Sequence, residues 1–191
     1  PGHAVWLTRT ALVFDSHEAA LPAEGRPASR EVTRLECLGA AANPAVIPQG
    51  PSGGTAHFLR GGDPASWTTG VETSAAVLYQ GLYKGIDLKV YGAARTVEYD
   101  WIVNPGGSVK DIAFRISGAA SPVLDRHGNL VVRSRHGEWV HRRPVAHQDI
   151  DGTRVDPTDL GAASDQIHDP VIFRYNNIWW VFGSYLPGKK G

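Results

Sequence analysis

Two carboxylates in the segment YKGIDLKVYGAARTVEYDWIVNPGG, residues 83–107, are the first candidates for chemistry. If the chain folds back at residues 92–95, Asp87 lies opposite Asp100 on one face of a hairpin. Glycosidases use paired carboxylates across a cleft, and such a pair can also bind calcium or an arginine side chain. Neighbours on one flat hairpin face form no cleft. We therefore interpret the pair as structural and held by an arginine, with calcium binding and catalysis as the alternatives.

The hairpin that would position these carboxylates has one apolar face and one charged face. On its charged face Lys89 would pair with Glu98, next to the two aspartates. Its apolar face would join aliphatic and aromatic residues, as buried cross-strand pairs do. The expected apolar pairs are Val90 with Val97, Leu88 with Tyr99, and Ile86 with Trp101.

Asp169 is a further catalytic candidate. The run IHDPVI at residues 167–172, followed by IWWVFGS at 178–184, resembles the first blade of five-bladed propeller glycosidases. In that family the Asp before Pro serves as general base. The reaction needs a second carboxylic acid across a sugar cleft, which Asp87 or Asp100 would have to supply. The alternative, which we favour, is that Asp169 begins a strand.

Histidines and acidic loops could bind metals, but their spacing argues against it. His141 and His147 would share one strand face about 20 Å apart, too far for one ion, so we expect exposed strand histidines there. The acidic loop from Asp149 and Asp151 onward lacks the ligand spacing of a calcium loop. We expect no metal site and no cofactor. If calcium binds, the candidate ligands are Asp87, Asp100, Asp149 and Asp151.

Tryptophans are the candidates for a binding surface. In a hairpin that joins residues 171–175 to 178–182, Trp180 would pair with Phe173, and Trp179 would pair with Arg174 on the opposite face. One Trp of this doublet should therefore point outward, where it could stack on a sugar or dock a protein. The expected binding surface is Trp179 with Arg174, and Trp67 and Trp139 are further candidates.

The elements that must carry these residues are short strands. Apolar and polar residues alternate with period 2 in many segments, and Gly, Pro, Asn and Asp punctuate them, which predicts an all-β, antiparallel β-sandwich-like domain. We expect loops at residues 21–29 and 42–55 and a helical turn at 108–111. Strands are expected at residues 4–7, 11–14, 31–38, 66–69, 73–79, 112–117, 122–124, 130–134, 139–149, 171–175 and 178–182, besides the hairpin.

Composition narrows the class of protein. The 191 residues suit a single β-rich module, residues 1–191, with a subdivision near residue 70 into 1–70 and 71–191 as the alternative. Lys and Arg balance Asp and Glu at 19 each, so no basic face for nucleic acid is expected. No apolar run is long enough for membrane insertion. Cys37 is the only cysteine and should be a buried hydrophobe.

Four runs carry a family resemblance. They are FLRGGDPASWTTGV at residues 58–71, LYKGIDLKVYG at 82–92, VEYDWIVNPGG at 97–107 and PVAHQ at 144–148. Their order and content resemble the uncharacterised domain near the N-terminus of bacterial surface proteins that carry SBBP-type β-propeller repeats. The match extends at least over residues 34–152 and more loosely over the whole chain. Its departures are His147, where an aromatic is usual, and the Trp179-Trp180 doublet.

The resemblance implies a secreted or surface-anchored β-rich module with no established activity. We therefore expect a non-catalytic extracellular structural or adhesive module of a bacterial surface or secreted assembly. Its partners would be its own downstream domains or neighbouring subunits, or a surface glycan. The alternative is a fragment of a polysaccharide-acting glycoside hydrolase that uses Asp169 as general base.

Overall fold

A computed structural model of the chain describes residues 2–17, 29–93, 96–118, 122–135, 137–145, 148–150, 153–155, 172–175 and 178–181. The described residues form antiparallel strands and two short 3-10 turns, η1 (Pro64–Ser66) and η2 (Val109–Asp111). The prediction of an all-β sandwich-like domain is confirmed. The helical turn expected at residues 108–111 is η2.

The strands follow one another in chain order as β1 (Gly2–Leu7), β2 (Ala11–His17), β3 (Arg30–Cys37), β4 (Ala45–Phe58), β5 (Thr68–Tyr83), β6 (Ile86–Ala93), β7 (Thr96–Val103), β8 (Ala113–Ser117), β9 (Val123–Leu124), β10 (Leu130–Ser134), β11 (Gly137–His141), β12 (Gln148–Ile150), β13 (Thr153–Val155), β14 (Ile172–Tyr175) and β15 (Ile178–Val181).

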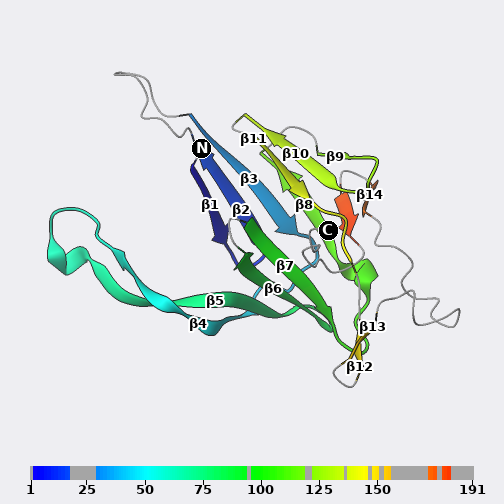
Figure 1. Cartoon of the computed structure of the whole chain (residues 1–191), viewed down its shortest axis with the longest axis horizontal. Helices are drawn as coiled ribbons and strands as arrows, with labels where there is room; N and C mark the ends of the chain where they lie inside the picture. The colour runs from blue at the N-terminus through cyan, green and yellow to red at the C-terminus, as the bar shows by residue number, and fades with distance from the viewer. Residues whose placement is uncertain are drawn as a thin grey trace, which may run out of the picture.

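Two main sheets form the layers of the sandwich. One has six strands in the order β1-β2-β3-β8-β15-β14, and the other has four in the order β4-β5-β6-β7. A three-stranded sheet, β11-β10-β9, and the β12–β13 hairpin complete the fold (Figure 1). The distal parts of β4 and β5 leave the body together and project as a long ribbon (Figure 1).

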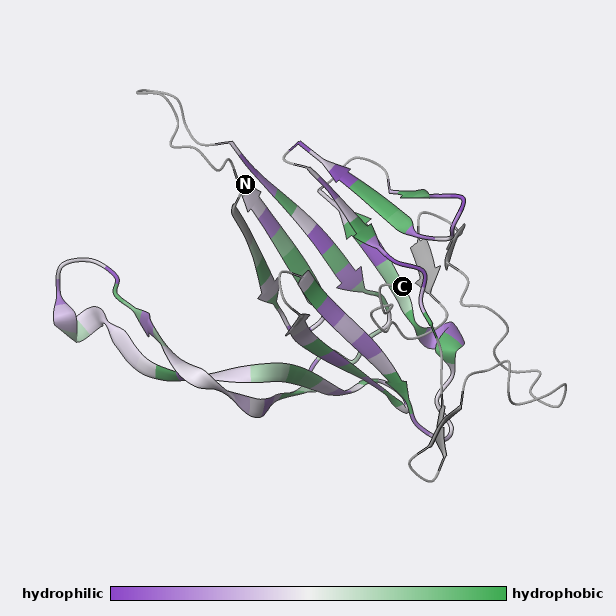
Figure 2. Ribbon diagram, viewed as in Figure 1, coloured by the Kyte–Doolittle hydropathy of each residue, from purple (hydrophilic) through white to green (hydrophobic). Residues whose placement is uncertain are grey.

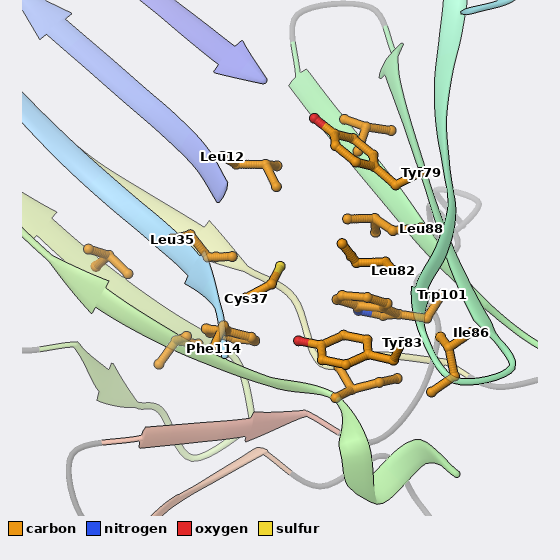
Figure 3. Packing of buried hydrophobic residues seen from close by; sticks show 14 residues of the cluster. Leu12, Leu35, Cys37, Tyr79, Leu82, Tyr83, Ile86, Leu88, Trp101 and Phe114 are labelled. Atoms are coloured by element: carbon orange, nitrogen blue, oxygen red, sulfur yellow. The ribbon is translucent and has the colours of Figure 1, made fainter. Parts of the chain in front are cut away.

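The core lies between the two main sheets. Side chains from the six-stranded sheet, such as Leu35 and Phe114, point toward Leu82, Leu88 and Trp101 of the four-stranded sheet (Figure 3). All of these are buried. Burying each side chain of this size stabilises the fold by about 1.5–3 kcal/mol. Cys37 is part of this cluster, as expected, and burial raises the pKa of its thiol to about 12.

Two tyrosines connect the sheets by hydrogen bonds inside this core. The Tyr79 hydroxyl donates to the Thr8 carbonyl oxygen over 2.8 Å, and the Tyr83 hydroxyl donates to the Ala113 carbonyl oxygen over 2.9 Å. A buried hydroxyl without a partner would cost stability, so these bonds fix where β5 sits against the other sheet. Burial raises the pKa of Tyr79 to about 12.

The register of the β6–β7 hairpin differs from the prediction by two residues. Asp87 faces Ile102, Lys89 faces Asp100 and Tyr91 faces Glu98. The predicted pairs of Asp87 with Asp100 and of Lys89 with Glu98 are therefore wrong.

The three predicted apolar pairs are wrong as well, since Val90 faces Tyr99, Leu88 faces Trp101 and Ile86 faces Val103. A shift by an even number of residues keeps each side chain on its own face of the sheet. Ile86, Leu88, Val90 and Trp101 are therefore still buried as expected, whereas Val97 is exposed and Glu98 is buried.

Residues 42–55, expected to be a loop, lie mostly in a strand. β4 begins at Ala45 and pairs with β5 over most of its length, with register shifts between Pro51 and Thr55 and between Ala56 and Phe58. β4 is an edge strand, so Pro48 and Pro51 can lie in it with their nitrogens turned away from the ladder. Glycine and proline content, read as a loop signal, here marks an irregular edge strand.

Candidate functional site

Asp87 has a structural role in the body of the domain. Its Oδ1 accepts a hydrogen bond from the Gly81 backbone N–H over 2.7 Å, and its Oδ2 accepts one from Asn104 Nδ2 over 3.2 Å. The carboxylate thus holds the irregular part of β5 to the segment that follows β7. Arginine, which we expected as its partner, takes no part in these bonds.

Asp100 lies on the same face of the hairpin but not opposite Asp87. It faces Lys89, and its Oδ1 accepts a hydrogen bond from the Tyr91 hydroxyl over 3.3 Å. Lys89 Nζ lies 5.8 Å from the centre of the Tyr91 ring. Oppositely charged groups that face each other across two strands attract. The structure therefore places each aspartate in its own set of contacts and brings no carboxylate pair together here.

Of the three remaining candidates for metal binding or acid–base catalysis, only one lies in a described strand. Asp149 is in β12, while Asp151 and Asp169 lie outside the described residues. Among the described residues, no group of three or more His, Cys, Asp or Glu side chains could hold a metal ion. The described part of the chain also contains no helix long and apolar enough to span a membrane.

His141 lies in an aromatic cluster and not on the surface, so the expectation of an exposed histidine is wrong for this residue. Its ring centre lies 4.9 Å from that of Trp139 and 5.9 Å from that of Tyr99. Its Nδ1 is 2.9 Å from the Tyr99 hydroxyl, whereas Nε2 is buried without a hydrogen-bond partner among the described residues. Burial lowers the pKa of His141 to about 4. His147, the other histidine expected on this strand face, is outside the described residues.

The tryptophan candidates occupy different environments. Trp139 is half-buried and stacks on Phe14, with 4.4 Å between the ring centres, so one face of its ring is covered. Trp179 pairs with Arg174, and Trp180 with Phe173, as predicted for β14 and β15. β15 also pairs with β8, which places this hairpin within the six-stranded sheet.

Trp67 lies on the most exposed feature of the described residues, the ribbon formed by residues 50–75, which we call the arm. No residue of the arm is buried, and every residue from 57 to 72 is exposed. The arm is pale in hydropathy, without the strong alternation of β2, β3 and β7 (Figure 2). Only three of its residues are charged, namely Arg60, Asp63 and Glu72.

Large apolar side chains gather toward the end of the arm. Phe58 is 50% exposed, Leu59 58% and Trp67 37%, and Val71 is also exposed. Single exposed apolar residues are normal on a protein surface, but several near the end of one projection are characteristic of interaction sites.

The tip of the arm, residues 58–67, is organised by its own hydrogen bonds. Asp63 caps η1, because its Oδ1 accepts from the Ala65 N–H over 2.9 Å. The Ser66 hydroxyl donates to the Arg60 carbonyl oxygen over 2.8 Å, and Trp67 Nε1 donates to the Gly61 carbonyl oxygen over 3.2 Å. These bonds within the tip fix its shape, and preorganisation of this kind lowers the entropic cost of binding.

The arm was missed in the sequence because burial periodicity cannot reveal a strand with no buried face. The available signal is turn chemistry. Gly61-Gly62-Asp63-Pro64 separates two β-prone runs, a pattern typical of a hairpin. The run FLRGGDPASWTTGV, one of the four that carry the family resemblance, forms the tip and the start of β5.

Fold and site together define an antiparallel β-sandwich with a projecting two-stranded arm. Residues 1–158 match the model of the family described as a domain of unknown function, DUF7948. The chain belongs to this family, because the match covers most of its length. Comparison with curated proteins and with solved structures gave no match to the chain.

Proposed function

We propose that this domain is a non-catalytic structural and adhesive module of a bacterial surface or secreted assembly, and that its arm binds a partner protein. The single observation that carries the proposal is the arm: residues 50–75 form a ribbon with no buried residue and a self-organised apolar tip. A two-stranded ribbon by itself is at best marginally stable in water. Contact with a partner would bury the apolar side chains that the arm leaves exposed.

The extracellular location rests on the resemblance to domains of SBBP-repeat surface proteins. In such an assembly the partner is either a downstream domain of the same protein or a neighbouring subunit. The arm suits a protein partner, because apolar and aromatic residues with few charges form the centre of protein interfaces. Arg60, Asp63 and Glu72 give it little charge with which to attract a polyanion.

Site-specific photo-crosslinking in the native host tests this proposal. A photoreactive amino acid at position 59, on the tip, should give a defined protein adduct. The same amino acid at position 123, where Val123 is also 50% exposed but lies on β9, should give none. A domain that crosslinks to nothing from position 59, or equally from both positions, would rule out a docking arm.

A surface glycan is the second candidate partner, and the partly exposed Trp67 favours it. Aromatic faces stack on sugars, and Trp67 is held in place through its Nε1. Co-sedimentation with a panel of polysaccharides tests this, with Trp67→Ala as the variant that should lose binding. If the wild type released new reducing ends and Asp169→Asn did not, the glycoside hydrolase alternative would be supported instead.

A further inference from the structure

The three-stranded sheet β11-β10-β9 is attached to the two main sheets by side chains and not by a backbone ladder. Among the described strands, none of its three members pairs with a strand of either main sheet (Figure 1). Leu130 and Val132 of β10 are fully buried in the core cluster, and Trp139 of β11 stacks on Phe14 of β2. A unit attached in this way can open locally while the ladders of the sandwich stay intact.

His141 of β11 is a polar link between this sheet and the sandwich. The centre of its ring lies 6.3 Å from that of Phe14, 5.9 Å from that of Tyr99 and 6.5 Å from that of Phe114, which belong to β2, β7 and β8. Nδ1 is 2.9 Å from the Tyr99 hydroxyl, and Nε2 is buried without a partner among the described residues. A protonated ring carries a hydrogen on both nitrogens. Protonation would therefore leave the Tyr99 hydroxyl without its acceptor and bury an unpaired charge, which is costly.

No described carboxylate faces this ring to offset such a charge. The charged residues on the strands around it are Asp15 on β2, Glu98 and Asp100 on β7, Arg115 on β8 and Glu138 on β11. Each of these is the chain neighbour of a residue in the aromatic cluster, so strand alternation turns it to the other face. Arg142, which follows His141, is exposed.

The titratable groups on the near faces of β7 and β3 are uncharged. They are the Tyr99 hydroxyl and the Cys37 thiol, and burial raises the pKa of both above its usual value. Burial alone lowers the pKa of His141 to about 4. The closed arrangement thus admits a neutral His141 and disfavours a charged one.

We propose that the three-stranded sheet is an acid-sensitive cover of the sandwich, and that proton uptake by His141 favours its detachment from β2, β7 and β8. Detachment brings His141 into water, where an imidazole binds a proton near pH 6.5. The ratio of open to closed sheet should therefore rise by roughly 25-fold between pH 7.5 and pH 5. This device does not involve the arm, so it fails or holds independently of the proposed function.

A second titratable contact of the same sheet supplies a matched control. The Arg135 backbone N–H, in the turn that follows β10, donates to Glu31 Oε2 of β3 over 2.7 Å. Glu31→Gln keeps an oxygen acceptor for this bond but cannot ionise. His141→Phe and His141→Gln both remove the proton site, and they retain an aromatic ring and a hydrogen-bonding group respectively.

Native-state amide hydrogen exchange of the whole chain from pH 7.5 to pH 5, corrected for the intrinsic effect of pH on exchange, tests the proposal. Amides of residues 130–134 and 137–141 should lose protection by roughly 25-fold in the wild type and in Glu31→Gln, but by less than about threefold in both His141 variants. Amides of residues 86–90 should stay at least about tenfold better protected at every pH, because local opening leaves β6 in place.

Protection of β10 and β11 that does not change with pH in the wild type overturns the proposal, as does a pH response that either His141 variant retains. A response that is lost in Glu31→Gln would make Glu31 the sensor and overturn it too. Equal protection of β6 and β10 would show that the sheet opens only when the whole domain unfolds, which contradicts local opening. An NMR titration of the wild-type His141 ring identifies the proton site without a variant, and a charged ring in the closed sheet at pH 5 would contradict the proposal.

Discussion

The two halves of β5 are one continuous strand in two different environments. Residues 76–83 include the buried Ala76, Tyr79, Leu82 and Tyr83, and Tyr79 and Tyr83 also hydrogen-bond across to the other sheet. Residues 68–75 pair with the same neighbour, β4, yet none of them is buried. Both halves pair with β4, but residues 76–83 also pair with β6 and pack side chains into the core, so the two halves differ in side-chain burial and in the number of neighbouring strands.

This comparison separates the residues that stabilise the fold from the residues that the fold exposes for binding. Hydrophobic burial is the dominant favourable term in folding, and it is concentrated in the body. The arm relies on β4–β5 backbone pairing and on local side-chain bonds such as Asp63 to Ala65 N–H. Substitutions in the body should therefore change global stability, while substitutions in the arm should change binding.

The largest expected effect comes from removing the same side chain in the two regions. Phe114→Ala leaves a cavity in the core and should lower the free energy of unfolding by about 3–5 kcal/mol. Phe58→Ala, on the arm, should change it by no more than about 0.5 kcal/mol. Urea denaturation of both variants measures the difference. Equal losses would show that the arm is part of the cooperative core.

The next effect is a pH dependence that belongs to the body. His141 has a folded-state pKa of about 4, lowered by burial from its ordinary value near 6.5. The unfolded chain therefore binds the proton first as the pH falls, so stability is full above about pH 6.5 and declines toward pH 4. The loss attributable to His141 should reach on the order of 3 kcal/mol, at about 1.4 kcal/mol per pH unit.

Denaturation at several pH values, with His141→Phe as the comparison, measures this effect. The variant removes the titrating group from the aromatic cluster, and its stability should vary less between pH 6.5 and 4 than that of the wild type. If the free energy of unfolding varied with pH equally in the two proteins, the assignment of this pH dependence to His141 would be contradicted.

The smallest effect compares two aspartates that each bind a backbone N–H. Asp87→Ala removes the bonds to Gly81 and Asn104 in the body and should cost about 1–2 kcal/mol of global stability. Asp63→Ala removes the cap of η1 at the tip and should leave global unfolding unchanged. Instead it should reduce photo-crosslinking from position 59. A global loss as large as that of Asp87→Ala would argue against an independent arm.

Sequence patterns predicted the body of the domain well because its strands have one buried face. In β3, Leu35 and Cys37 are buried between half-buried Arg34 and Glu36, as the alternation requires. The pairing of Trp179 with Arg174 was also predicted. The register of β6 against β7 was not predicted. Two turn lengths place the same residues on the buried face, and only the observed pairing of Lys89 with Asp100 distinguishes one register from the other.

The candidate site was predicted only in part, for reasons that particular residues illustrate. Trp67 was expected to take part in binding, but the arm that carries it lacks a buried face and so leaves no periodic signal. His141 was expected to be exposed because strand alternation describes a single strand. Its burial comes from Tyr99, which lies 42 residues earlier in the chain and belongs to another sheet.

Amide hydrogen exchange along β5 tests the central claim most directly, because one strand contains both environments. In the dilute purified chain, amides of residues 68–75 should exchange at least about 100-fold faster than those of residues 76–83, since no core covers them. They should become protected when the partner binds. Equally slow exchange in both halves of the dilute chain would contradict the account, because the arm would then be stable without a partner.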